Sequence, residues 1–139
     1  MTKVLPVTAP EKHTDYFITK DGQTFAGVHL IIDIWDAVNL TDVNHVDQTL
    51  RSAALESGAT ILHSHMHHFS PEGGVSGVVL LAESHISIHT WPERSYAAVD
   101  IFMCGECDPE KTIPILQNGF GPAKITVQNI RRGIVKGEG

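Results

Sequence analysis

The sequence is short of positive charge. Its 139 residues include 10 lysines and arginines against 16 aspartates and glutamates, which gives a formal net charge of −6. No run of basic residues offsets this balance, whereas proteins that grip a phosphate backbone usually carry a basic patch or stripe. We therefore expect no nucleic-acid partner.

Long apolar runs, a targeting leader and a set of cysteines are also lacking. No apolar stretch approaches the roughly 20 residues that a transmembrane helix needs, and no basic region leads into an apolar one at the N-terminus. The only cysteines, Cys104 and Cys107, are too few and too close together for a disulfide framework. We expect a cytoplasmic protein with no membrane partner.

The length and composition allow one domain. With 42% hydrophobic residues the chain can form a moderate core, so we expect a single domain over residues 1–139. Residues 1–14 mix proline, threonine and charge without a period, which is typical of a loose N-terminal arm.

Several segments have the composition of strands. Asp21-Gly22 lies between two short apolar runs and predicts a hairpin, because this dipeptide favours a tight turn. The run from Val28 to Trp35 is β-branched and aromatic, which suits a central strand. Further strands are predicted over residues 59–69, 75–82, 96–104 and 123–130.

Two segments have the period of a helix. Apolar residues recur at helical spacing after Thr41, which predicts a helix capped by Thr41 and ended by Gly58. Asp108 and Pro109 suit the cap and first turn of a second helix. Adjacent strands with helices at two points indicate an α+β fold, an antiparallel sheet with helices on one face.

Two predicted strands meet at Glu83-Ser84 with almost no loop. Two-residue hairpins favour residues such as Asn-Gly that accept a positive φ. Glu-Ser supplies neither, so we expect the peptide at this corner to be strained, and strain of this kind suggests function.

A turn at this corner would set Val78 opposite His89 and Ser76 opposite Trp91. It would bring a second hydroxyl and an imidazole into one neighbourhood. Strict alternation, however, places Ser84 and His89 on opposite faces of the sheet. A strand that begins after Ser84, or a bulge, would remove this conflict.

Three blocks of the sequence resemble the bacterial S-adenosylmethionine decarboxylases, which are pyruvoyl-dependent. The blocks are Gly74-Val75-Ser76-Gly77-Val78, Glu83 to Glu93, and Tyr96 to Gly105, within a resemblance from about Phe25 to Pro109. In that family the bond that matches Glu83-Ser84 is cut by the protein itself. The resemblance also implies the family fold, a two-layer α/β sandwich.

The chemistry of such a cut follows from the two residues. The Ser84 hydroxyl can add to the Glu83 carbonyl and exchange the amide for an ester. Removal of the Ser84 α-proton then expels the Glu83 carboxylate, and the dehydroalanine hydrolyses to a ketone and ammonia. The products would be chains 1–83 and 84–139, with a pyruvoyl cofactor at position 84 that forms a Schiff base with the substrate amine and acts as an electron sink.

The resemblance implies roles for three further residues. His89 would accept the proton during processing, Ser76 would help to hold the adduct, and Cys104 would donate a proton after decarboxylation. An imidazole, a hydroxyl and a thiol suit these tasks. Taken alone, a turn serine or a packed cysteine has an ordinary structural role, and the surrounding match is what favours chemistry.

The substrate implied by the resemblance is S-adenosylmethionine, and its decarboxylated product donates aminopropyl groups for spermidine synthesis. Glu93 matches a carboxylate that accepts hydrogen bonds from the ribose, and without the family a solvated surface charge is an equal alternative. Phe69 is our candidate for stacking on adenine. A chain this small is expected to act as a homodimer of cleaved protomers. Related pyruvoyl enzymes act on arginine or ornithine, so these substrates are the first alternative.

Other patterns suggest different functions. His63, His65 and His67 alternate along one predicted strand with His68 beside them, a spacing that can hold zinc or iron. A histidine-rich metal-binding protein is therefore a rival prediction. Cys104 and Cys107 form a C-x-x-C pair that could be redox-active. An interaction domain without catalysis is a third reading, favoured if the chain never cleaves.

Overall fold

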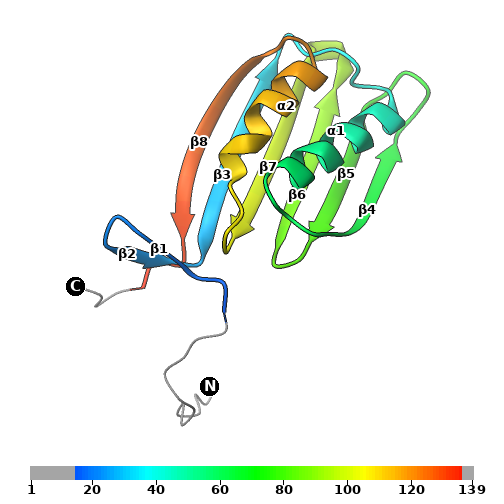
Figure 1. The fold of residues 1–139 in the computed structure, drawn as a ribbon. Coiled ribbons are helices and arrows are strands. Elements are labelled where there is room, and N and C mark those ends of the chain that lie inside the picture. The colour runs from blue at the N-terminus through cyan, green and yellow to red at the C-terminus, as the bar shows by residue number, and fades with distance from the viewer. Residues whose placement is uncertain (1–14, 136–139) are drawn as a thin grey trace, which may run out of the picture.

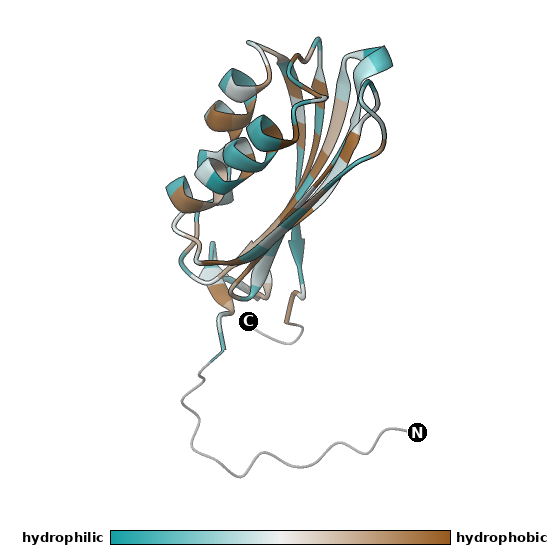
Figure 2. Ribbon diagram, turned by 90° about the vertical axis from the view of Figure 1, so that its right-hand side faces the viewer, coloured by the Kyte–Doolittle hydropathy of each residue, from teal (hydrophilic) through white to brown (hydrophobic). Residues whose placement is uncertain are grey.

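The computed structural model describes residues 15–135, which form a curved six-stranded antiparallel sheet with helices on one face (Figures 1 and 2). The predicted arm, residues 1–14, lies outside the described residues. In chain order the elements are β1 (Ile18–Lys20), β2 (Gln23–Phe25), β3 (Gly27–Trp35), α1 (Val43–Glu56), β4 (Ile61–His68), β5 (Val75–Leu81), β6 (Ser84–Trp91), η1 (Pro92–Arg94), β7 (Tyr96–Cys104), η2 (Pro109–Lys111), α2 (Thr112–Gly119) and β8 (Lys124–Arg132).

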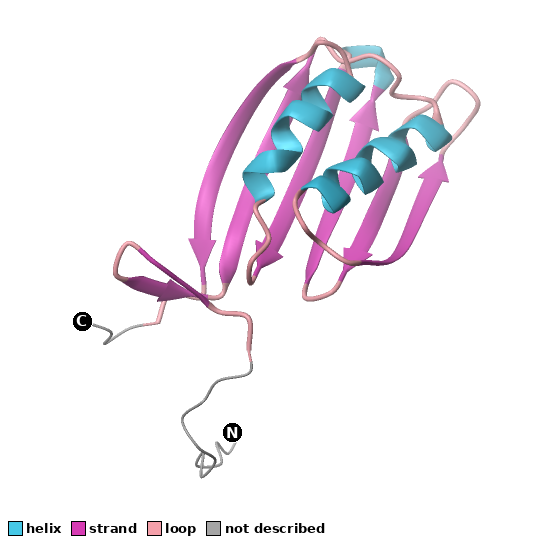
Figure 3. Cartoon of the chain, viewed as in Figure 1, coloured by secondary structure: helices cyan, strands magenta, loops and turns pink. Residues whose placement is uncertain are grey.

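The strands follow the order β4-β5-β6-β7-β3-β8, and every neighbouring pair is antiparallel. Three consecutive hairpin connections build β4 to β7, whereas β3 comes from earlier in the chain and lies between β7 and β8 (Figure 3). The predicted antiparallel sheet with helices on one face is confirmed. Among residues 15–135, no helix covers the other face of the sheet, which we call the open face.

The predicted N-terminal hairpin is confirmed as a separate two-stranded sheet of β1 and β2. Its two loop residues, Asp21 and Gly22, have φ of +55° and +74°. Positive φ at both positions is the condition for a type I′ turn, which Asp-Gly meets. The hairpin lies at the end of the sheet where β3 begins and β8 ends (Figure 1).

The predicted position of the β5–β6 turn is wrong by one residue. Leu81 pairs with Ser84, so the two loop residues are Ala82 and Glu83. As a result the register differs by two residues from the prediction, and Ser76 lies opposite His89 rather than opposite Trp91. The reason is that Ser84 takes a place in the ladder as the first residue of β6.

Neither a later start of the strand nor a β-bulge brings Ser84 and His89 onto one face, so both of these predictions are wrong. The strand β6 begins at Ser84, and its pairing with β5 and β7 runs on without a bulge. Alternation therefore holds along the strand. Ser84 is buried, whereas His89 is exposed on the open face.

Both helices start slightly later than predicted. The cap of α1 is Asp42, not Thr41, because the Asp42 carboxylate accepts a hydrogen bond from the His45 N–H at 3.0 Å. Asp108 caps the short helix η2, which leads into α2. Gly58, with φ of +91°, follows the end of α1 as expected.

The core lies between the sheet and the two helices (Figure 2). The apolar positions of α1 predicted to share a face include four that are fully buried, namely Val46, Leu50, Ala53 and Ala54. They pack on the inward residues of the strands, such as Val79, Ile88 and Ile101. Within residues 15–135 no helix is both long and apolar enough to cross a membrane.

Candidate active site

The corner between β5 and β6 holds a non-glycine residue in an unfavourable conformation. Glu83 has φ of +64°, in the left-handed region, and Ala82 beside it does not share the positive φ of a type I′ turn. A conformation of this kind costs roughly 1–3 kcal/mol for a residue with a side chain. The expected strain at the bond between Glu83 and Ser84 therefore has a structural basis.

Cys104 contacts both residues of this bond. Its thiol donates a hydrogen bond to the Glu83 carbonyl oxygen at 2.9 Å, and its backbone N–H donates to Ser84 Oγ at 3.3 Å. The Cys104 sulfur lies 3.8 Å from Ser84 Oγ. A donor on the carbonyl withdraws electron density from its carbon, so the arrangement favours attack by the neighbouring hydroxyl.

The end of β7 places Cys104 at this corner. In the ladder Gly27 of β3 lies opposite Cys104, and a Cβ on Gly27 would be 2.6 Å from the Met103 carbonyl oxygen. After Cys104 the chain turns at Gly105, with φ of +65°. A glycine on each side therefore allows the close approach of backbone on which the position of the thiol depends.

Ser76 and His89 form a second polar group. They lie directly opposite each other on β5 and β6, and Ser76 Oγ is 2.8 Å from His89 Nδ1. Both side chains project from the open face of the sheet. The predicted neighbourhood of hydroxyl and imidazole therefore exists, through a different register.

This pair is far from the corner within one chain. His89 lies five positions after Ser84 in β6, and at about 3.3 Å per residue this corresponds to roughly 17 Å. The two side chains also leave the strand on opposite faces. The structure thus brings Glu83, Ser84 and Cys104 together, and separates them from Ser76 and His89.

Phe69 and Glu93 lie at the end of the sheet that is opposite the β5–β6 corner. Phe69 directly follows β4 and is 65% exposed, with the His67 ring packed edge-on at 4.6 Å between ring centroids. Glu93 lies in η1, just after β6, and its side chain is exposed. We call Phe69, Ser76, His89 and Glu93 the distal group, and Glu83, Ser84 and Cys104 the corner group.

The histidines of the open face do not converge on a metal site. Among residues 15–135 no three histidine, cysteine, aspartate or glutamate side chains are placed to hold one ion. His63, His65 and His67 all project from the edge strand β4, opposite Leu80, Val78 and Ser76 of β5. Farther along the sheet, burial and then the nearby His29 lower the pKa of His85. These side chains form a polar surface rather than a ligand cluster.

Cys107, the second cysteine of the C-x-x-C pair, lacks the lowered pKa of a reactive thiol. Both cysteines are free. Burial, and then the neighbouring Cys104, raise the pKa of the Cys107 thiol. A raised pKa lowers the fraction of reactive thiolate at neutral pH, whereas redox cysteines have lowered values.

Sequence reasoning missed two features of this region. Tyr16 and Phe17 line cavities beside Cys104, and the Tyr96 hydroxyl donates to Asp33 Oδ1 at 2.6 Å on the open face. The Asp-Gly turn signal located the N-terminal hairpin, and Tyr16 and Phe17 directly precede its first strand. No local pattern could show which part of the sheet it would reach, because the contact spans about ninety residues of sequence.

Comparison with known proteins gives consistent results. The family model described as S-adenosylmethionine decarboxylase matches residues 28–133. The S-adenosylmethionine decarboxylase proenzyme of Methanococcus vannielii is 49% identical over 112 residues, which cover 78% of this chain and 91% of the relative. That of Thermomicrobium roseum is 41% identical over 110 residues, covering 78% and 95%. The crystal structure of the adenosylmethionine decarboxylase from Aquifex aeolicus matches with a TM-score of 0.71 and 35% identity, over 83% of this chain and 97% of that one.

Proposed function

This chain belongs to the S-adenosylmethionine decarboxylase family, and on that premise we propose that it cuts itself between Glu83 and Ser84 and then decarboxylates S-adenosylmethionine. The product would serve as the aminopropyl donor for spermidine synthesis. The observation that carries the proposal is the contact of Cys104 with both sides of the bond to be cut. We place the enzyme in the cytoplasm, where its two free thiols stay reduced.

The corner group has the parts that self-cleavage needs. Ser84 Oγ adds to the Glu83 carbonyl carbon, and the Cys104 thiol, 2.9 Å from the carbonyl oxygen, stabilises the negative charge that develops there. The amide then becomes an ester. Loss of the Ser84 α-proton breaks the ester and releases Glu83 as a carboxylate. Water replaces the nitrogen of the resulting dehydroalanine, and ammonia leaves.

The new group at position 84 suits an amino-acid substrate. A pyruvoyl ketone condenses with the substrate amine and accepts the electron pair that remains when carbon dioxide leaves. Cys104 holds a proton at Sγ, 3.8 Å from Ser84 Oγ, and is the proton donor to the product. Ser84 is 7% exposed, so few water molecules compete with the thiol for this role.

A homodimer would unite the corner group with the distal group. In one chain the separation of roughly 17 Å between Ser84 and His89 is too large for direct contact. A twofold axis that lies between two open faces and crosses the strands would place the distal end of one copy over the corner of the other. Ser76 and His89 of the second copy would then assist processing, as the sequence resemblance implies.

The same dimer would enclose the substrate. Phe69 is largely exposed and offers a ring face for adenine, and the exposed Glu93 carboxylate can accept hydrogen bonds from both ribose hydroxyls. Both lie at the end of the sheet that the twofold axis would bring to Cys104. We therefore assign ribose binding to Glu93 and adenine stacking to Phe69.

The decisive experiment combines intact mass spectrometry with a turnover assay. Freshly purified protein should convert at neutral pH into fragments 1–83 and 84–139, and the second fragment should react with hydroxylamine as a ketone. The Ser84→Ala variant should remain one chain. Ser52→Ala, an exposed serine on α1, is the matched control and should cleave normally. A wild-type chain that stays intact would contradict the proposal.

The choice of substrate needs a separate comparison. Cleaved protein should release carbon dioxide from S-adenosylmethionine faster than from arginine or ornithine. Glu93→Gln should raise KM for S-adenosylmethionine, because the amide is a weaker acceptor for a diol. Turnover of arginine or ornithine alone would transfer the proposal to that substrate.

A further inference from the structure

The N-terminal hairpin is fastened to the corner group. The family-model match begins at residue 28, so β1, β2 and the residues before them lie ahead of it. The Gly105 N–H donates to the Tyr16 carbonyl oxygen at 2.8 Å, one residue beyond Cys104. At the far end of the hairpin, Arg131 donates to Asp21 at 2.6 Å and its guanidinium lies 4.6 Å from the centre of the Phe25 ring.

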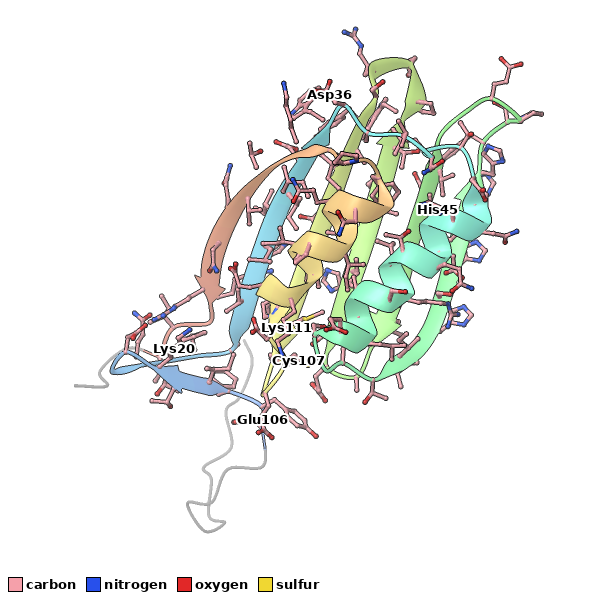
Figure 4. All side chains as sticks on the ribbon, turned by 45° about the horizontal axis from the view of Figure 1, so that its top comes forward. Lys20, Asp36, His45, Glu106, Cys107 and Lys111 are labelled. Carbon is pink, nitrogen blue, oxygen red and sulfur yellow. The ribbon has the colours of Figure 1, made fainter. Side chains whose placement is uncertain are left out.

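This attachment holds the Tyr16 ring next to Gly105. A Cβ at Gly105 would be 3.1 Å from Tyr16 Cδ1, so the ring lies on the position where other residues carry a side chain. Figure 4 shows Glu106 and Cys107 at the end of the sheet from which the segment to Lys20 departs. The absence of a side chain at Gly105 thus gives Tyr16 its place beside the catalytic thiol.

Two cavities are lined by Tyr16, and both are also lined by Glu83 and Cys104. The first, of about 230 Å³, is also lined by Thr60 and Cys107. The second, of about 310 Å³, is also lined by Phe17 and Phe102. The second is the more apolar, and its lining includes one aromatic ring just before β1 and another from β7.

Tyr16 and Phe17 leave much of their aromatic surface open. Tyr16 is 56% exposed and Phe17 is 45% exposed, although both border a cavity. Both cavities are lined by Glu83, which is bonded to Ser84, and by Cys104, whose sulfur is 3.8 Å from Ser84 Oγ, so the rings border the space next to the proposed attachment point of the substrate. The part of S-adenosylmethionine nearest to the attachment point is apolar methylene chain, followed by a methylated sulfonium. Aromatic rings favour both methylene groups and a cation.

From these observations we propose that Tyr16 and Phe17 form an aromatic wall of the substrate site that contacts the methylene chain and the methylsulfonium of S-adenosylmethionine. The proposal rests on the proposed function. Under this proposal, the N-terminal segment, which precedes the residues matched by the family model, contributes to substrate specificity.

The test uses Tyr16→Ala, Phe17→Ala and the double variant in the full-length chain. Self-cleavage is first verified for each by intact mass, so that failure of the proposed function is recognised separately. We expect kcat/KM for S-adenosylmethionine to fall by about 10- to 100-fold in the double variant, mainly through KM, as is usual for lost apolar contacts. Val38→Ala, an exposed apolar residue at the other end of the sheet, is the control and should change little.

A second readout reports contact with the sulfonium itself. Inhibition by S-adenosylhomocysteine, which lacks the methyl group and the charge, is compared with the affinity for S-adenosylmethionine. The preference for the sulfonium should shrink in Phe17→Ala and in Phe17→Leu, which keeps apolar volume without a ring, but persist in Tyr16→Phe. If the alanine variants do not cleave, the leucine variant provides the test.

Three outcomes would overturn the inference. In the first, the double variant cleaves normally and keeps KM and kcat within twofold of the wild type. In the second, Phe17→Leu retains the full preference for the sulfonium. In the third, none of the variants cleaves, which would assign the two aromatic residues to folding of the corner. A wild-type chain that neither cleaves nor decarboxylates would instead refute the proposed function.

Discussion

One side chain, that of Cys104, lies beside both residues that flank the proposed cut. Its thiol lies 2.9 Å from the Glu83 oxygen and 3.8 Å from Ser84 Oγ. Under the proposed function this thiol would act as a hydrogen-bond donor in self-cleavage and as an acid in decarboxylation. The two roles contribute different amounts to the two rates, so removing the thiol should slow the two reactions by different factors.

We predict that Cys104→Ala affects turnover more than self-cleavage. Loss of a general acid typically lowers a rate by about 10²–10⁴-fold. Loss of one neutral hydrogen bond, worth about 1 kcal/mol, should slow cleavage by about tenfold or less. Precursor decay followed by mass spectrometry and carbon dioxide release by the cleaved variant measure the two. Cys107→Ala should leave both unchanged, and equal losses in the two steps for Cys104→Ala would contradict these roles.

Tyr96 gives a prediction on pH. The hydrogen bond to the Asp33 carboxylate, aided by burial, raises the pKa of Tyr96 to about 12. The folded state therefore keeps its proton above the ordinary value of about 10. This stabilisation is complete below pH 10 and is lost as the pH rises from 10 to 12.

Phenolate absorbance measures this shift directly. The chain has two tyrosines, so in a Tyr16→Phe background Tyr96 is the only phenol. Its absorbance should rise with a midpoint near 12. In the Asp33→Asn background the midpoint should move back towards 10, because a neutral amide does not oppose the phenolate charge. A midpoint unaffected by Asp33→Asn would exclude this cause.

At the scale of elements, Gly77 controls how closely β4 approaches β5. A Cβ at Gly77 would be 2.8 Å from the His65 carbonyl oxygen and would collide with the Met66 sulfur. The methionine sulfur can shift, but the backbone oxygen belongs to the ladder that joins the two strands. β4 is an edge strand, so it has no second neighbour to hold it.

We predict that Gly77→Ala displaces β4 and lowers stability by about 1–3 kcal/mol, the usual cost of overpacking. The melting temperature should fall by several degrees, and backbone amides of β4 should exchange with solvent faster than those of β7. The exposed Leu62→Ala on β4 is the control, with an expected effect of about 0.5 kcal/mol or less. Unchanged exchange in β4 would show that the strand pair accommodates the methyl group.

The elements themselves were largely predictable from local patterns. Asp21-Gly22 fixed a hairpin, and the helical spacing after Thr41 located α1. The corner was placed one residue too late, because Glu83, rather than a glycine, adopts the positive φ. A turn rule based on favoured residues cannot identify a turn that departs from them. The resemblance nevertheless identified Ser84 and Cys104 as candidate site residues. Their contact could not be predicted from it, because the contact depends on β6 and β7 being neighbours in the sheet.

At the scale of the whole molecule, the proposed cut would assign strands that are interleaved in one sheet to two separate chains. Fragment 1–83 contains β3, β4 and β5, and fragment 84–139 contains β6, β7 and β8. In the sheet β3 lies between β7 and β8, while β5 pairs with β6. Three ladders therefore join the fragments. Sequence alone could not give this order, because it depends on pairing between distant segments.

We predict that the fragments stay together until the protein unfolds. Size exclusion under native conditions should give one peak containing both, at the mass of a dimer of 15.2 kDa chains. After denaturation, refolding of the cleaved protein should depend on concentration, because two chains have to meet. Ser84→Ala, which remains one chain, should regain its fold at a rate independent of concentration. Separation of the fragments without denaturant would contradict the interleaved order.

The bond between Glu83 and Ser84 also determines the electrical outcome of its own rupture. Ordinary proteolysis creates an ammonium and a carboxylate together, which cancel. In the proposed reaction the nitrogen would leave as ammonia, so only the carboxylate of Glu83 would be added and the protein would become one unit more negative than the −6 of its precursor. This extra negative charge would lie next to the proposed binding site of a substrate that carries a sulfonium, so self-cleavage would make the local electrostatic potential more favourable to a cationic substrate.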